Sequence, residues 1–108
     1  MNEPTELLIA LPSELPADVV AYKRTAEFTA KTLPEALKAA HTTKSGVWGL
    51  IHVLDGRLLY CLEAPHKGQR LINPGEKAPI PPGIPHRVEF VESGRFFVEF
   101  FKKPSNAS

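Results

Sequence analysis

The hydrophobic residues of this chain come in short runs that prolines and glycines separate. Eleven prolines and seven glycines are spread over 108 residues, so few stretches are long enough for an extended helix. Between these breaks the runs have strand-like composition, and several of them alternate apolar and polar positions. The pattern predicts an all-β sandwich or barrel.

We expect about eight strands, joined to their neighbours in the chain by hairpins. The stretch 47–54 is apolar on both faces, as a central strand would be. Asp55–Gly56 follows it and predicts a tight hairpin, after which 57–62 would return along the first strand. Glu92–Ser93–Gly94 predicts a further turn. The other expected strands are 22–28, 70–72, 77–80, 87–91 and 95–102.

The segment 33–44 fits two structures. Thr32 could cap a short helix with Pro34 in its first turn. In a strand, Leu37, Ala39, His41 and Thr43 would share one face, and the lysines on the other face would lie in water. We favour the strand because it leaves both lysines solvated.

The most distinctive pattern lies around His86. Gly75, Pro81 and Gly83 precede it at fixed offsets, which predicts a tight turn leading into a strand. In that strand His86 shares its face with apolar residues at alternate positions. Such a histidine is either a corner residue hydrogen-bonded to a nearby carbonyl group or a metal ligand, and we favour the metal ligand.

Length and charge limit the possible functions. The chain is long enough for one domain with a single core. Thirteen basic residues against twelve acidic ones predict no nucleic-acid partner, and no apolar run is long enough to cross a membrane. The single cysteine, Cys61, is expected to be a buried, inert thiol, which suits the cytoplasm. Lys23, Arg24 and Lys44 are interpreted as solvated charges, although a modest anion site stays open.

These motifs resemble those of a known family. The run from Gly75 to His86 matches the second cupin motif, and His41-x₁₄-Gly56 approximates the first, with Thr43 in place of that motif's second histidine. Together with Tyr22-Lys23-Arg24-Thr25 and Phe97-Val98-Glu99-Phe100, they make the chain similar to the small cupin family of YeaR and the N-terminal domain of TehB-type tellurite-resistance proteins.

The resemblance implies a cupin-like β-barrel (a double-stranded β-helix or jelly roll) over residues 22–103, preceded by an extended arm, 1–21, and followed by a polar tail, 104–108. It also implies that His41 and His86 hold one divalent metal ion, which could be zinc, nickel, iron or manganese. A link to stress from tellurite, similar oxyanions or nitrosative compounds follows by association. The metal would act as a Lewis acid or as a binding centre for a small molecule or oxyanion.

Two imidazoles alone bind a divalent ion poorly, so a third ligand is needed. Glu99 is our candidate, because an unpaired carboxylate among phenylalanines would be costly to bury. An exposed edge position or a salt bridge to Arg87 or Arg95 would also explain Glu99. His52 is expected to be a packed histidine, and Glu89 a solvated or paired charge.

Three alternatives remain open at this point. The barrel could be a metal-free binding module for an apolar or acidic metabolite. The arm 1–21 could complete a homodimer by covering an exposed sheet edge. An isomerase-type cupin would need a general base, for which only Glu99 and His52 are available. Whether the chain is an enzyme therefore stays open.

Overall fold

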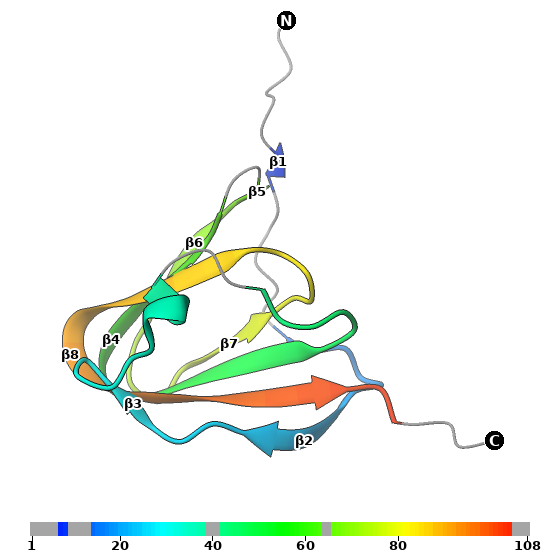
Figure 1. Ribbon diagram of the computed structural model, residues 1–108, viewed down its shortest axis with the longest axis horizontal. Coiled ribbons are helices and arrows are strands. Elements are labelled where there is room, and N and C mark those ends of the chain that lie inside the picture. The colour runs from blue at the N-terminus through cyan, green and yellow to red at the C-terminus, as the bar shows by residue number, and fades with distance from the viewer. Residues whose placement is uncertain (1–6, 9–13, 39–41, 64–65, 105–108) are drawn as a thin grey trace, which may run out of the picture.

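The computed structural model describes residues 7–8, 14–38, 42–63 and 66–104, and within them the fold is built from strands (Figure 1). One short 3₁₀ helix, η1, accompanies them. The elements are β1 (Leu7–Leu8), β2 (Val20–Arg24), β3 (Phe28–Thr29), η1 (Glu35–Lys38), β4 (Trp48–Leu62), β5 (His66–Lys67), β6 (Gln69–Ile72), β7 (Lys77–Ile80) and β8 (His86–Lys102).

Two long strands, β4 and β8, organise the sheet. They pair antiparallel from Trp48↔Phe101 to Leu62↔His86. Strand β2 and strand β3 pair with the second half of β8, whereas β6 and β7 pair with β4. A separate parallel pair joins β1 to β5.

The ladder of β4 and β8 bends near its middle, so that its two halves form two layers (Figure 1). One layer contains β2, β3, β7, the first half of β4 and the second half of β8. The other contains β6, the second half of β4 and the first half of β8. The space between the layers is the interior of the fold.

The hairpins predicted at Asp55–Gly56 and Glu92–Ser93–Gly94 are wrong, because both segments lie inside the continuous strands β4 and β8. The register shifts around Asp55 and Arg57, as it does at β-bulges. A side chain at Gly94 would collide with the backbone of Asp55. Gly56 and Gly94 are needed where β4 and β8 cross closely at the bend, and neither glycine reverses the chain.

The strand expected over 33–44 is also contradicted. Residues 35–38 form η1, in which the Leu37 amide donates to the Pro34 carbonyl over 3.0 Å, and 42–44 lie outside any strand. Proline has no amide hydrogen for a strand ladder and suits the first turn of a helix. Residues 39–41 lie outside the described residues.

The core lies between the two layers. Ile51, Leu58, Tyr60, Ile72 and Phe96 are completely buried there. Leu33, just before η1, packs into the same cluster. In the described residues, no helix is long and apolar enough to span a membrane.

Candidate functional site

A cavity of about 290 Å³ opens between the two layers of the sheet. Its described wall is mainly apolar and comes from both layers, from η1 and from the loop before β4. The lining residues are Thr25, Phe28, Pro34, Leu37, Thr43, Ile80, His86, Val98 and Phe100. Among them His86 is the one ionisable residue, so it defines the chemistry of the cavity.

The His86 ring is buried and held in one orientation. Only 3% of the residue is exposed, and the edge of the ring meets Tyr60 with centroids 5.9 Å apart. Its Nδ1 lies 3.2 Å from the carbonyl oxygen of Ile84. Because a carbonyl oxygen can only accept, Nδ1 carries the hydrogen, and in the neutral ring Nε2 is then the atom with a lone pair. The hydrogen bond to a nearby carbonyl is therefore present, as both the corner-histidine and the metal-ligand interpretations allow.

Tyr60, beside His86, has a buried hydroxyl with no hydrogen-bond partner among the described residues. Its side chain is completely buried, as expected for a core residue. Burial raises the pKa of the Tyr60 hydroxyl far above the ordinary tyrosine value, and the charge of Arg70 lowers it by less. The unsatisfied hydroxyl is a feature for which the sequence carries no local signal.

Glu99 lies on the other face of the sheet from His86. Val98 and Phe100 line the cavity, and Glu99 between them points outward by alternation along β8. There its Oε1 lies 2.9 Å from Nε2 of His52, and the His52 ring stacks on Phe97 at 4.4 Å. The structure therefore does not bring Glu99 and His86 together. The partner of Glu99 is His52, not Arg87 or Arg95.

His41, the remaining predicted ligand, lies outside the described residues. Thr43, two positions later, lines the same cavity as His86. In the described part of the chain, no three histidine, cysteine, aspartate or glutamate residues are grouped closely enough to hold a metal ion. The described wall thus offers a metal one imidazole, which is fewer ligands than a protein zinc site uses.

Two further predictions concern residues outside the cavity. Glu89 pairs with the guanidinium of Arg87 over 2.6 Å, so the interpretation of Glu89 as a paired charge is confirmed. Cys61 is buried, as expected, and burial raises the pKa of its thiol. A raised pKa leaves little thiolate at neutral pH, so this cysteine is not an activated nucleophile.

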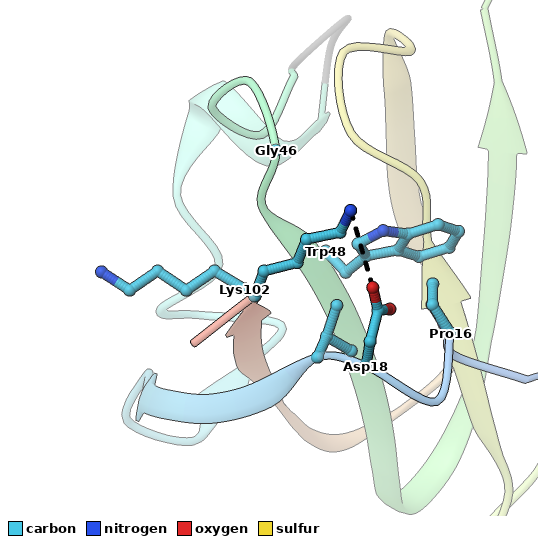
Figure 2. Close-up of a pocket in the computed structure, with 7 residues that line it drawn as sticks. Pro16, Asp18, Gly46, Trp48 and Lys102 are labelled. Atoms are coloured by element: carbon cyan, nitrogen blue, oxygen red, sulfur yellow. Dashed lines mark ion pairs between the residues drawn. The ribbon is translucent and has the colours of Figure 1, made fainter. Parts of the chain in front are cut away.

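Trp48 lies in a pocket on the outer surface (Figure 2). This depression of about 610 Å³ also contains Pro16, Gly46 and an ion pair of 3.5 Å between Lys103 and Asp18. Its charged groups partly neutralise each other, and it is open to solvent. We therefore place the candidate site in the smaller interior cavity, although the outer pocket is larger.

Comparison with known proteins gives a family match. The model of the TehB-like domain matches residues 23–98. A crystal structure of a protein from E. coli (strain K12) is 24% identical, with a TM-score of 0.77, over 85% of this chain and 98% of that one. TehB from Haemophilus influenzae is 26% identical, with a TM-score of 0.72, over 81% of this chain but only 32% of its own length. Among curated proteins, none matches this chain in sequence.

These matches confirm both the expected all-β, cupin-like fold and the resemblance to TehB-type proteins. The chain corresponds to about a third of the Haemophilus protein.

Proposed function

The chain belongs to the TehB-like family, and from that premise we propose that it is a binding protein whose cupin-like barrel holds one small molecule at His86. The observation that carries this proposal is the buried imidazole, with its Nδ1 bonded to a backbone carbonyl, in the wall of an otherwise apolar cavity. Small-molecule sites in proteins have this composition, with apolar walls and a few fixed polar groups.

The apolar residues of the wall and His86 would have different roles in binding. Burial of hydrocarbon against Phe28, Leu37, Ile80 and Val98 would provide the affinity. His86, the one ionisable group of the described wall, would then set the orientation through a polar contact with a hydroxyl or amide of the ligand. A cavity of about 290 Å³ is at the small end of ligand sites, so the ligand is expected to be small.

Binding is better supported than acid–base catalysis. An isomerase needs a general base within hydrogen-bond reach of its substrate. Glu99 and His52, the two candidates, pair with each other on the outer face. The described wall of the cavity contains His86 as its one titratable group.

The test uses 1-hexanol as a probe, since it has an apolar body and one hydroxyl donor. We expect it to shift the NMR resonances of His86 and Val98. The variant His86→Phe preserves a ring but removes the acceptor, so it should weaken binding about three- to tenfold, the range for one hydrogen bond. The matched control is His52→Phe, which changes the same residue type on the outer face and should leave the affinity unchanged.

The proposal fails if 1-hexanol leaves the cavity resonances unchanged in the parent protein. It also fails if His86→Phe and His52→Phe weaken binding equally, because the effect would then not depend on the cavity. Circular dichroism of both variants checks that the fold is preserved.

A second candidate function is metal binding, and the hydrogen bond from Nδ1 of His86 to Ile84 favours it. Metal-binding histidines usually donate their other ring nitrogen to a carbonyl or carboxylate group in this way. His86 would be one ligand and His41 a second, and Glu99 is left out because it faces outward. A bound divalent ion would supply a Lewis acid for an oxyanion, which is the setting in which a role in tellurite or nitrosative stress would make chemical sense.

Elemental analysis of protein purified without a metal-affinity tag distinguishes the two functions. About one metal ion per chain, lost in both His41→Ala and His86→Ala while the fold survives, would establish the metal function. Absence of metal, with thermal stability unchanged by a chelator, would leave the apolar ligand as the occupant.

We also propose a cytoplasmic location, on the basis of the single buried cysteine, and a homodimer. All five residues of β2 are exposed, and in the described sheet β2 pairs on one side only, with β8. An open edge of this kind can pair with another chain. Sedimentation at high protein concentration would show a monomer if this is wrong.

A further inference from the structure

A second pocket shares a wall with the His86 cavity. It has a volume of about 250 Å³ and is lined by Tyr22, Lys23, Thr42, Thr43, Lys44, Val47 and Phe100. Thr43 and Phe100 belong to both linings. The two pockets therefore adjoin at Thr43 and Phe100, and we call the outer one the vestibule.

The vestibule is positively charged, in contrast to the apolar cavity behind it. Lys23 and Lys44 lie 21 positions apart in the sequence, yet both line it. Among the described residues, neither lysine has a carboxylate within ion-pair distance. The ammonium group of Lys23 instead lies 5.3 Å from the centre of the Phe100 ring. No acidic residue of the described wall offsets these two charges.

Irregular backbone brings both lysines to this pocket. The β2–β8 register shifts between Ala21 and Lys23, and this bulge allows two consecutive residues, Tyr22 and Lys23, to face the same pocket. Lys44 lies in a tight turn that its carbonyl closes by accepting from the Val47 amide over 3.0 Å. The Thr43 hydroxyl also donates to the Val47 carbonyl over 2.8 Å. Fixed backbones reduce the ordering cost of binding.

We propose that vestibule and cavity form one site for a small amphipathic carboxylate. Its carboxylate would lie between Lys23 and Lys44, and its apolar body would pass Thr43 and Phe100 into the cavity towards His86. This inference rests on the proposed binding function and adds the chemical class of the ligand. A fully anionic ligand would not suit the cavity alone, because burying a charge against apolar walls is costly.

The test compares 6-hydroxyhexanoate with its neutral analogue 6-hydroxyhexanamide, which has the same body and terminal hydroxyl. We expect the carboxylate to bind about fivefold more tightly at low ionic strength, a gain typical of exposed ion pairs. Added salt should reduce this difference by screening. In the double variant Lys23→Gln/Lys44→Gln the two affinities should become equal. Lys77→Gln, an exposed lysine outside both pockets, is the matched control and should preserve the preference.

Equal affinities in the parent protein, or a preference that survives in the double variant, would overturn the carboxylate site. The cavity function would still stand in that case if 1-hexanol binds. If 6-hydroxyhexanoate, 6-hydroxyhexanamide and 1-hexanol all fail to bind, both proposals fail. Binding of 1-hexanol to the double variant also verifies that its cavity is intact.

Discussion

Two histidines lie on opposite faces of the bent sheet, and their surroundings differ. His86 faces the interior, is 3% exposed, and contacts Tyr60 and the Ile84 carbonyl. His52 faces outward, where its side chain is 15% exposed and pairs with Glu99. Both residues have apolar neighbours in the sequence. The difference arises because the bend encloses one face of the sheet and leaves the other face only partly covered.

Glu99, a carboxylate, also lies on the open face of the sheet. Four phenylalanines surround it in the sequence, yet its side chain is 30% exposed and has an imidazole partner. Phe97 covers one side of the His52 ring by stacking on it. The guanidinium of Arg24 lies 4.3 Å from the centre of the same Phe97 ring. A charge in an aromatic segment therefore needs no metal when the strand alternates between an enclosed face and an open one.

The largest effect is expected at the bend, on which the enclosure of the inner face depends. A methyl group at Gly94 would collide with the Asp55 backbone, which cannot move independently of β4. We expect Gly94→Ala to lower the free energy of unfolding by about 3 kcal/mol or more, because the clash involves backbone atoms. Urea denaturation would measure the loss.

Gly46→Ala is the matched control for that substitution. Gly46 has φ of 76°, but a methyl group there would meet no atom within 4 Å. Its cost should be about 1 kcal/mol, from backbone strain alone. If both variants lose the same stability, the close crossing of β4 and β8 is not what shapes the inner face.

A smaller effect should separate the two histidines. His86→Ala would leave a void in the core and remove the contact with Tyr60, at a cost of about 2 kcal/mol or more. His52→Ala removes a partly exposed pair, and we expect it to cost about 1 kcal/mol or less. Thermal and urea unfolding of the two variants measure the difference, and equal losses would contradict the contrast between enclosed and open faces.

Much of the fold can be predicted from local patterns. The strand at Lys77–Ile80 has the expected bounds, and His86 and Val88 share a buried face as period-two alternation predicts. The Asp55–Gly56 signal also identified a real property, since Gly56 has φ of 72°. The prediction of a hairpin was wrong because the Asp55–Gly56 pattern fixes only the backbone conformation of these two residues. Whether the chain then reverses or only bends depends on β8, which comes 30 or more residues later.

The site was harder to predict because its contacts are non-local. The partner of Glu99 lies 47 positions away, on a neighbouring strand. Lys23 and Lys44 each resemble ordinary solvated lysines, and only the folded sheet brings them to one pocket. His86 was identifiable because a turn motif and strand alternation, both local, place it on the inner face.

The smallest effect at neutral pH is expected on removal of the Tyr60 hydroxyl, and it reports on how dry the inner face is. This buried group has no hydrogen-bond partner in the described structure. Tyr60→Phe removes an unsatisfied polar atom, so at neutral pH it should be neutral or stabilising by up to about 1 kcal/mol. Urea unfolding of both proteins gives the difference.

The difference between parent and Tyr60→Phe should then grow in alkaline solution. Burial raises the pKa of Tyr60 in the folded protein, whereas an unfolded tyrosine titrates near about pH 10. Above that pH the unfolded chain releases a proton that the folded chain keeps, so the folded parent loses stability with a slope of up to about 1.4 kcal/mol per pH unit. Tyr60→Phe has no hydroxyl to release a proton at this position, while all other titrating groups are common to both proteins. The difference should be constant below about pH 9 and rise above about pH 10. A difference that stays constant through pH 11 would mean that the hydroxyl ionises as easily in the folded protein as in the unfolded chain, and that the inner face is more open to water than the structure indicates.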